Sequence, residues 1–277
     1  MEQTLTAETI GYDYGKRTVL RNVFLEVPQG MLAVLLGANG SGKSTLLRIL
    51  AGLKTPSTGR VRLNGQDLHR MKPAKRARLV GFLPQQHRPV FPFAVEEVVL
   101  TGRAARVRLM PGPEDREQAR LALEQVGISH LRQRPFTELS GGEQQLVMIA
   151  RVLAQQPKII MLDEPTAHLD LHFQAHLMQL LRMLVREGLT VIAVLHDPNQ
   201  AISLADQFYF LKDGTCLEPP NHQSPWNVSF LSRVYSTPLQ EVAFGARPLV
   251  FPLFSNALAG NNSSEEIELN NNAVFSV

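Results

Sequence analysis

Hydrophobic and polar positions divide the chain into segments with two different periods. Over the first thirty residues they alternate, as in VLRNVFLEVPQG, which predicts short antiparallel strands. Continuous apolar runs follow further along, MLAVLL, LVGFLP, KIIML and TVIAVL, and such runs are typical of buried strands. Residues 59–65, GRVRLNG, predict an edge strand, and QFYFLKDGTCLE predicts a hairpin that turns at Asp213 and Gly214.

A period of three to four residues indicates the helices. In DREQARLALEQVG the apolar residues Ala119, Ala122, Leu123 and Val126 fall at i, i+3, i+4 and i+7, which predicts one buried face. STLLRILAGL predicts a helix directly after MLAVLL. Two more helices are expected, from Ser140 to about Gln156 and from Leu171 to Arg186.

The order of these segments predicts an α/β fold. Strands that alternate with helices favour a mainly parallel sheet with crossover helices, here preceded by an N-terminal antiparallel β subdomain and interrupted by a helical subdomain at about residues 95–140. We expect residues 3–218 to form the main domain and residues 219–255 a C-terminal appendage with a short helix from Ser229 to Tyr235. Residues 256–277 are rich in Asn, Ser and Glu, which predicts a mobile tail.

Composition narrows the class of protein. Hydrophobic residues make up 44% of the 277 residues, and every apolar run is far shorter than the roughly 20 residues that span a bilayer, so we expect a soluble globular protein. The first residues contain no basic start followed by an apolar stretch, so no secretory signal is expected. The one cysteine, Cys216, excludes an internal disulfide. We expect it to fill space in a strand, with a reactive thiol as the alternative.

The net charge of +3 is too small to favour nucleic acid or an anionic membrane as a partner. Basic residues nevertheless cluster in HRMKPAKRARLV, residues 69–80, and in GRAARVR, residues 102–108. We expect both clusters to lie on solvated helix faces. Contact with phosphate groups or with a partner surface is the alternative.

The stretch GANGSGKST, residues 37–45, matches the pattern G-x-x-x-x-G-K-[ST] between a predicted strand and a predicted helix. Its glycines allow backbone N–H groups to turn toward a phosphate, and the helix N-terminus favours the same charge. Lys43 is expected to reach the β- and γ-phosphates of a nucleotide, Ser44 to bind Mg²⁺, and Thr45 to contact the α-phosphate. The other loop residues expected to bind nucleotide are Gly37, Asn39, Gly40, Ser41 and Gly42. An ordinary glycine loop is the alternative.

The stretch IIMLDEPT, residues 159–166, places two acids at the end of a predicted buried strand. Asp163 is expected to hold Mg²⁺ through water, because strand ends of this kind lie beside the phosphate loop. Glu164 points differently and is expected to accept a proton from an attacking water or to orient that water. A solvated turn is the alternative.

A second glycine-rich turn, LSGGEQQL at residues 139–146, also precedes a predicted helix. A serine at a helix start with open backbone N–H groups is suited to binding an anion. Two such turns in one chain require either two ligands or one ligand approached from two sides.

The phosphate loop, LSGGE, LDEPT and a histidine after the next strand, in this order, resemble the ATP-binding subunit of an ABC transporter, a transporter with an ATP-binding cassette. The resemblance covers about residues 5–218 and implies a P-loop NTPase core, ATP and Mg²⁺ as ligands, and ATPase activity. Family members often have arginine at the position of Leu146, a departure that leaves the phosphate-facing residues unchanged.

The resemblance implies further residues around the nucleotide. It places Tyr14 against adenine, with a plain strand-end tyrosine as the alternative. It places Gln85 beside Mg²⁺ and the attacking water, with Gln86 as the competing choice. His196 is implied to contact the γ-phosphate.

The resemblance also answers the question of the second glycine turn. It implies that Ser140, Gly141 and Gly142 cap the γ-phosphate of ATP bound to another copy, so that two cassettes close head to tail around two nucleotides. Asp170 is implied to lie in the loop that couples the two active sites. A homodimer is therefore expected.

Further expectations concern partners and cargo. The dimer should work on two separate transmembrane permease subunits at the cytoplasmic face of the inner membrane, indirectly with a solute-binding protein and without nucleic acid. FPFAVEEVVLTGR, LDLHFQ and HDPNQAISLADQFYFLKDG look closest to subunits of importers for ferric siderophores, haem, cobalamin and related chelates. Importers of molybdate, tungstate, zinc or manganese, and exporters, are the alternatives. A soluble cassette protein acting on ribosomes or DNA is a remote alternative, because such proteins usually carry two cassettes or a long coiled-coil insertion.

Overall fold

The computed structural model describes residues 4–85, 91–107, 109–219, 224–244 and 247–253. Its first sheet is antiparallel, with β1 (Thr4–Tyr14), β2 (Arg17–Pro28), β4 (Thr58–Leu63) and β5 (Gln66–Asp67) in the order β2-β1-β4-β5. The predicted antiparallel strands are confirmed, but they are longer than expected, because β1 and β2 pair from end to end as one long hairpin. The prediction of an edge strand is wrong, because β5 pairs with the outer side of β4.

The second sheet carries the parallel strands. Its order is β10-β9-β3-β8-β7-β6, made of β3 (Leu32–Leu36), β6 (Val80–Leu83), β7 (Ile159–Asp163), β8 (Thr190–Val194), β9 (Gln207–Lys212) and β10 (Thr215–Leu217). All neighbouring pairs are parallel except β9 and β10, which form the predicted hairpin. Every residue of β3, β7 and β8 is buried, as expected for continuous apolar runs. The predicted mainly parallel sheet is confirmed.

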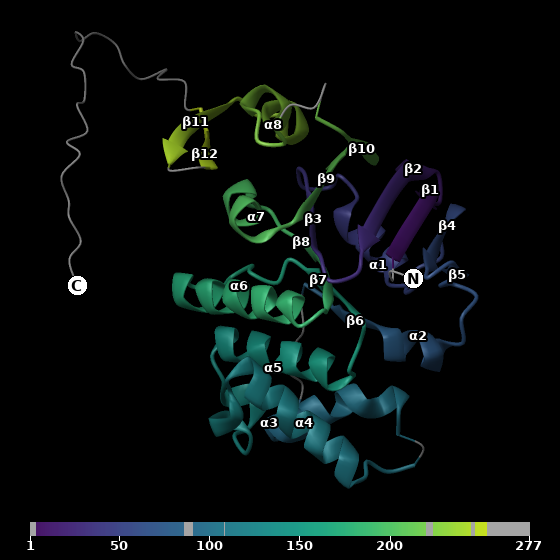
Figure 1. The fold of residues 1–277 in the computed structure, drawn as a ribbon, viewed down its shortest axis with the longest axis vertical. Helices are drawn as coiled ribbons and strands as arrows, with labels where there is room; N and C mark the ends of the chain where they lie inside the picture. The colour runs from purple at the N-terminus through teal and green to yellow at the C-terminus, as the bar shows by residue number, and fades with distance from the viewer. Residues whose placement is uncertain (1–3, 86–90, 108, 220–223, 245–246, 254–277) are drawn as a thin grey trace, which may run out of the picture.

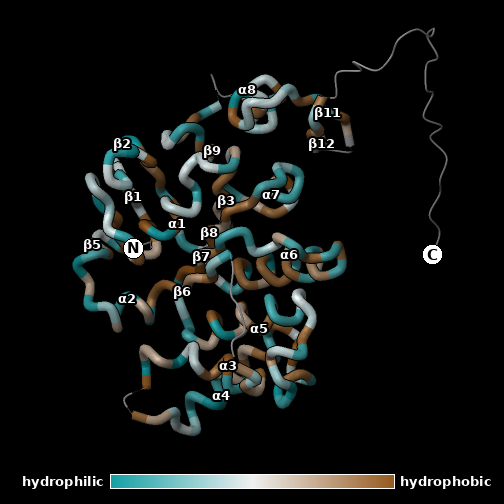
Figure 2. The backbone as a smooth tube through the Cα atoms, turned by 180° about the vertical axis from the view of Figure 1, so that it is seen from behind, coloured by the Kyte–Doolittle hydropathy of each residue, from teal (hydrophilic) through white to brown (hydrophobic). Residues whose placement is uncertain are grey.

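The parallel sheet separates two hydrophobic cores (Figures 1 and 2). Val34 and Leu36 of β3 face a core shared with α5 (Gly141–Ala154), α6 (Leu171–Arg186) and the helical insertion. Ala33 and Leu35 face α1 (Lys43–Leu50) and the antiparallel sheet. Because successive side chains of a strand point to opposite faces, one apolar strand contributes to both layers.

The helical insertion lies beside α5 and consists of two helices and three short 3-10 turns. These are α3 (Val95–Leu100), η1 (Thr101–Ala105), α4 (Pro113–Val126), η2 (Ser129–Leu131) and η3 (Phe136–Glu138). The buried residues of α4 are Ala119, Ala122, Leu123 and Val126, which confirms the predicted face. None of the helices in the described ranges is long and apolar enough to cross a membrane.

One helix was not predicted, α7 (Pro198–Leu204), whereas α2 (Pro73–Leu79) lies in the first basic cluster, where a helix face was expected. α7 has only seven residues, too few for a helical period to be recognised in the sequence. By contrast, α6 has the predicted bounds, and α5 ends at Ala154, two residues before the expected end.

The C-terminal appendage contains α8 (Val228–Tyr235), β11 (Leu239–Phe244) and β12 (Arg247–Pro252), of which only the helix was predicted. The Asn199 side chain of α7 holds β12 by two hydrogen bonds: its Nδ2 donates to the Val250 carbonyl oxygen at 2.9 Å, and its Oδ1 accepts from the Val250 N–H at 2.8 Å. The predicted mobile tail lies outside the described residues.

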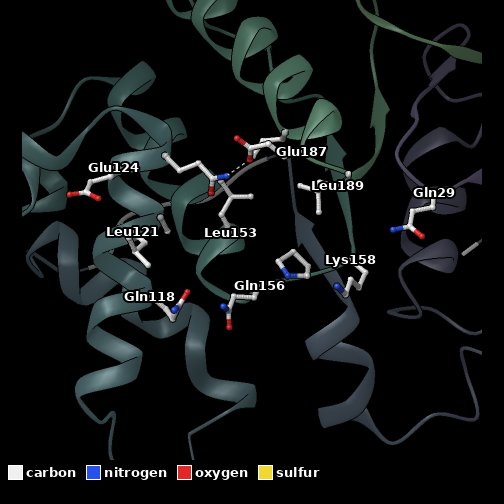
Figure 3. Close-up of a pocket in the computed structure, with 14 residues that line it drawn as sticks. Gln29, Gln118, Leu121, Glu124, Leu153, Gln156, Lys158, Glu187 and Leu189 are labelled. Carbon is white, nitrogen blue, oxygen red and sulfur yellow. Dashed lines mark hydrogen bonds between the residues drawn. The ribbon is translucent and has the colours of Figure 1, made fainter.

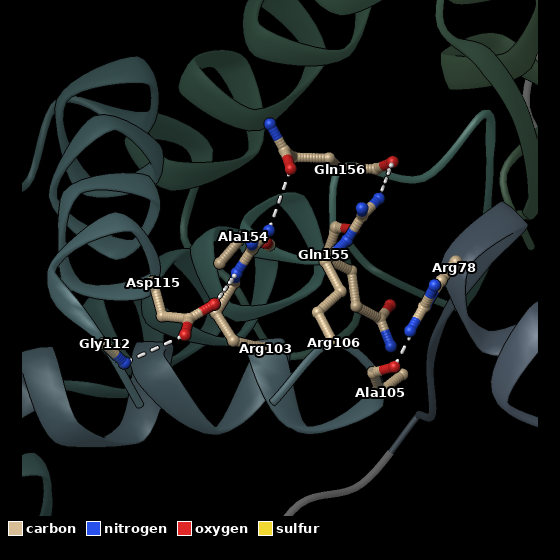
Figure 4. A network of polar contacts seen from close by, with 9 residues as sticks. All are labelled: Arg78, Arg103, Ala105, Arg106, Gly112, Asp115, Ala154, Gln155 and Gln156. Atoms are coloured by element: carbon tan, nitrogen blue, oxygen red, sulfur yellow. Dashed lines mark hydrogen bonds and ion pairs between the residues drawn. The ribbon is translucent and has the colours of Figure 1, made fainter. Parts of the chain in front are cut away.

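Arginines of the second basic cluster hold the end of α5 (Figure 4). Arg103 is buried; its Nε lies 2.9 Å from Asp115 Oδ1, and its Nη1 donates to the Ala154 carbonyl oxygen at 3.0 Å. Arg106 Nε donates to the Gln155 carbonyl oxygen at 3.0 Å. These cations satisfy carbonyls that the helix end leaves unpaired, at the negative end of its dipole. The expectation of a solvated face is therefore wrong for Arg103.

Cys216 lies half-buried in β10, as predicted. Burial raises the pKa of its thiol to about 11. The alternative of a reactive thiol is not supported, because the thiolate is the nucleophilic form.

A cavity of about 780 Å³ opens between the insertion and the sheet (Figure 3). Its lining includes Gln118 and Glu124 of α4, Gln156 and Lys158 before β7, and Leu189 before β8. Across it, Gln125 Nε2 donates to Glu187 Oε2 at 2.8 Å. None of the predicted site residues lines this cavity, so it is separate from the candidate nucleotide site.

Candidate nucleotide site

The phosphate loop joins β3 to α1 through a backbone that requires glycine. Gly37 has φ +144°, and a Cβ there would lie 2.1 Å from the Leu211 carbonyl oxygen. Gly42, the N-cap of α1, has φ +106°, in the region that side chains disfavour. The loop therefore ends where α1 presents its unpaired N–H groups, the arrangement suited to a phosphate.

Lys43 folds back over this loop. Its Nζ donates to the carbonyl oxygens of Gly37 at 2.8 Å and Ala38 at 2.9 Å. The side chain is buried, and burial lowers the pKa of Lys43, while the charges of Glu164 and Asp163 oppose that shift. The ammonium group is thus held at the loop by neutral acceptors, which a charged phosphate oxygen can replace as a stronger acceptor.

A cavity of about 340 Å³ surrounds the loop. It is lined by Tyr14, Arg17, Val19, Asn39, Gly40, Gly42, Lys43, Ser44, Thr45 and Glu164. All of these except Arg17 and Val19 are predicted site residues. Arg17 adds a cation that sequence reasoning missed, because no motif includes it.

Ser44 and Asp163 form the candidate metal position. Ser44 Oγ donates to Asp163 Oδ1 at 2.7 Å, and Asp163 is buried at the end of β7. Burial raises the pKa of Asp163, against the hydrogen bond from Ser44 and the charge of Arg48. Asp163 Oδ2 has no hydrogen-bond partner among the described residues and lies 3.8 Å from Arg48 Nη2. A hydroxyl and a carboxylate with one unused oxygen are donors that Mg²⁺ prefers, so these residues fit the ion.

Glu164 is oriented by side chains from two neighbouring strand ends. It follows β7 with φ +53°, so its side chain leaves the line of the strand. Gln85 Nε2 donates to Glu164 Oε2, and His196 Nε2 lies 2.5 Å from Glu164 Oε1. Gln85 comes just after β6 and His196 just after β8, the two neighbours of β7. Three strand ends therefore converge on one carboxylate, whose side chain is only 11% exposed.

Tyr14 lines the other side of the cavity and is 48% exposed. Lys54 Nζ donates to its hydroxyl at 2.6 Å and lies 3.9 Å from the centre of its ring. The hydrogen bond from Lys54 lowers the pKa of Tyr14. Sequence reasoning missed Lys54, because its contact with Tyr14 depends on the pairing of distant segments.

Ser140 and Asp170 lie outside the Lys43 cavity, at exposed helix N-termini. Ser140 caps α5: its N–H donates to Glu143 Oε2 at 2.8 Å, and its Oγ accepts from the Glu143 N–H at 3.3 Å. Asp170 caps α6, where its Oδ1 accepts from the Phe173 N–H at 2.9 Å. The structure therefore does not bring these two residues to the cavity around their own Lys43.

The two glycines after Ser140 differ in what surrounds them. A Cβ on Gly142 would lie 2.3 Å from the Phe173 ring of α6, so packing requires glycine there. A Cβ on Gly141 would meet no described atom within 4 Å. No contact with a described residue therefore requires glycine at position 141.

The sequence profile of the family described as ABC transporter matches residues 20–167, which contain the phosphate loop, the Ser140 turn and the Asp163–Glu164 pair. The chain belongs to the ABC transporter family. This confirms the predicted family and the predicted ATPase class. Curated ABC relatives extend the match beyond that segment. The ferric enterobactin transport ATP-binding protein FepC of Escherichia coli (strain K12) is 37% identical over 264 residues, covering 94% of this chain and 97% of its own.

Further comparisons cover most of this ABC transporter chain. The hemin import ATP-binding protein HmuV of Burkholderia lata is 38% identical over 274 residues, covering 90% of this chain and 99% of its own. A metal-chelate type ABC transporter in an inward-facing conformation matches with a TM-score of 0.79 at 29% identity, over 91% of this chain and 98% of that one. Dimeric MJ0796, a bacterial ABC transporter cassette, matches with a TM-score of 0.69 at 32% identity, over 77% and 97%. The predicted fold class is confirmed.

Proposed function

We propose that this ABC transporter chain is the ATP-hydrolysing subunit of an importer. Two copies close on two molecules of ATP and drive uptake of a metal chelate through separate permease subunits at the cytoplasmic face of the inner membrane, with a solute-binding protein delivering the cargo. The observation that carries this proposal is the convergence of Gln85 and His196 on Glu164, close to the Ser44–Asp163 pair.

The cavity around the phosphate loop suits a nucleoside triphosphate. The N–H groups at the start of α1 and the Lys43 ammonium stabilise phosphate charge, and Tyr14 at the other side offers a ring to the adenine. Mg²⁺, held by Ser44 and Asp163, would neutralise charge that develops on the phosphates. Gln85 is the third proposed ligand, because its amide oxygen is not used in the contact with Glu164.

Glu164 is the proposed general base. Its carboxylate is held at both oxygens and nearly enclosed, so it can orient one water for attack on the γ-phosphate and accept a proton from it. His196 keeps Glu164 in place and contacts the γ-phosphate. The left-handed φ of +53° at Glu164 interrupts the extended backbone of β7 directly after Asp163, so the two acids do not share the alternation of a strand.

The dimer completes each site. Ser140 and Gly141 are exposed, lie outside the cavity of their own chain, and stand at a helix N-terminus suited to an anion. A head-to-tail dimer brings them to the γ-phosphate held by the other copy, with Asp170 in the loop between the two sites. The dimeric structure of MJ0796 supports this arrangement.

The proposed cargo rests on the relatives. FepC is named for ferric enterobactin, HmuV for hemin, and the solved neighbour for metal chelates. We therefore propose a ferric siderophore, haem or a cobalamin-like chelate. Reconstitution with the membrane subunits that co-purify should give ATP-dependent uptake of one of these compounds, and uptake of only molybdate or zinc would contradict the cargo class.

Glu164→Gln tests the enzymatic part. Hydrolysis, measured as phosphate release, should fall roughly 10²- to 10⁴-fold because the base is lost. ATP binding should persist, and an ATP-bound dimer should accumulate in size-exclusion chromatography. Glu124→Gln, an exposed acid on α4, is the matched control and should hydrolyse ATP normally. Rapid turnover by Glu164→Gln would remove this residue from the role of base.

A further inference from the structure

A second cavity, of about 590 Å³, lies beside the phosphate loop and has no role in the mechanism above. Its lining includes Asn39 and His196 on one side and Tyr235, Leu239, Val250 and Phe251 of the C-terminal appendage on the other. The cavity is therefore polar toward the nucleotide site and apolar toward the appendage.

The walls of this cavity are held in place without a ligand. The two hydrogen bonds between Asn199 and Val250 fix β12 to α7, and the Tyr235 hydroxyl donates to the His196 carbonyl oxygen at 3.4 Å. Val250 is buried, whereas Phe251 is 41% exposed. A preformed apolar wall of this kind needs little ordering when a partner side chain enters it.

Leu171 is one of the most exposed apolar side chains among the described residues. It follows Asp170 at the start of α6 and is 83% exposed. Because α5 leads into β7 and α6 joins β7 to the parallel strand β8, both helices begin at the edge where the strands end. Glu164, His196 and the second cavity lie at that edge too.

Leu171 is also coupled to the Ser140 turn. Gly142 packs directly against Phe173, so the starts of α5 and α6 form one unit. When Ser140 contacts a surface of another molecule, Leu171 therefore lies close to the same surface.

We propose that Leu171 of each copy enters the second cavity of the other copy, which makes the C-terminal appendage part of the dimer interface. The inference rests on the head-to-tail dimer proposed above. In that dimer Ser140 comes to the partner's phosphates, and the cavity adjoins those phosphates through Asn39 and His196. Leu171 and the second cavity lie at the same edge of the sheet of one chain. A two-fold axis between two copies therefore forms the contact twice.

Site-specific cross-linking tests this contact. In a Cys216→Ser, Glu164→Gln background, a chain with Leu171→Cys is mixed with a chain with Phe251→Cys under mild oxidation. A disulfide-linked dimer should form only with ATP and only when both cysteines are present. Leu109→Cys, at a leucine 94% exposed on the insertion, replaces Leu171→Cys as the control and should not link. Equal linking of the control, or linking of Leu171→Cys to its own kind, would overturn the inference.

A charged residue in place of Leu171 gives an independent test of the proposed contact. In the Glu164→Gln background, Leu171→Asp should weaken the ATP-bound dimer roughly tenfold or more, because a buried leucine contact is lost twice. Leu109→Asp should leave the dimer unchanged, and both should bind ATP as the parent does. If the Glu164→Gln parent forms no dimer, the proposed function fails. If the parent and Leu171→Asp dimerise equally, only the present inference fails.

Discussion

The two glycine-rich turns lie at the same edge of the parallel sheet but differ in how much of their surroundings their own chain supplies. The phosphate loop is held by contacts of its own chain: Lys43 is buried and hydrogen-bonded, and Ser44 Oγ donates to Asp163 Oδ1. The turn at Ser140 is exposed, and among the described residues the Ser140 hydroxyl is hydrogen-bonded to Glu143 of its own capping box. Within the described residues, this exposed, anion-suited turn lies outside the cavity around the phosphate loop, which supports its proposed place in a dimer interface.

Ser140→Arg should have the largest effect, because it should impair ATP hydrolysis without impairing ATP binding at the phosphate loop. A bulky cation at the positive end of α5 blocks the shared site, so ATP hydrolysis should fall roughly 10²-fold and its cooperativity in ATP should disappear. Binding of ATP to the single chain should be unchanged, because Ser140 lies outside the Lys43 cavity. Steady-state rates against ATP concentration and a nucleotide-binding titration measure the two effects. Undiminished hydrolysis would contradict a site shared between copies.

Gly142→Ala and Gly141→Ala should differ in their effects on stability and on ATPase activity. The Cβ at 142 would clash with Phe173, so Gly142→Ala should lower the free energy of unfolding by about 2 kcal/mol. A Cβ at position 141 would meet no described atom within 4 Å, so Gly141→Ala should not destabilise the chain, yet it should reduce ATPase activity in the dimer. Urea denaturation and phosphate release distinguish these outcomes. Equal destabilisation by both variants would contradict the packing explanation.

The smallest effect is expected from the Arg103–Asp115 pair at the C-terminal end of α5. It should appear as a change in how the stability of the fold depends on pH. The Gly112 N–H, and after it Arg103, hold the pKa of Asp115 below its usual value. Since the folded pKa lies below the unfolded one, the stability that Asp115 contributes is complete above the unfolded value, about 4, and is lost as pH falls through the folded value. Asp115→Asn should flatten the acid side of the stability curve in thermal unfolding between about pH 3 and pH 7. An unchanged acid side would contradict this.

Much of the fold follows from local sequence pattern. The buried face of α4, the bounds of α6 and the β9–β10 hairpin depend on periodicity and turn residues, which act over a few positions. β5 could not be predicted in this way, because a two-residue strand exists only through its pairing with β4. The same holds for the β11–β12 hairpin, which Asn199 fixes from a distant helix.

The candidate site divides in the same way. The phosphate loop and the Asp163–Glu164 pair are contiguous motifs, so both could be predicted from the sequence. Arg17 and Lys54 were missed, because each reaches the site only through the folding of the antiparallel sheet beside it. Arg103 was misjudged for a related reason: nothing in a run of arginines distinguishes the one that will be buried.

The left-handed backbone of Glu164 has an evolutionary consequence. At φ +53°, a residue with a side chain is strained by about 1 kcal/mol, whereas glycine adopts this angle with almost no strain. Selection for heat resistance alone therefore favours glycine at position 164, while the proposed role of Glu164 as general base would make selection for turnover favour glutamate. A library of variants selected only for thermal stability should therefore accumulate inactive variants with glycine at position 164. Selected variants must be assayed for ATP turnover as well as for melting temperature.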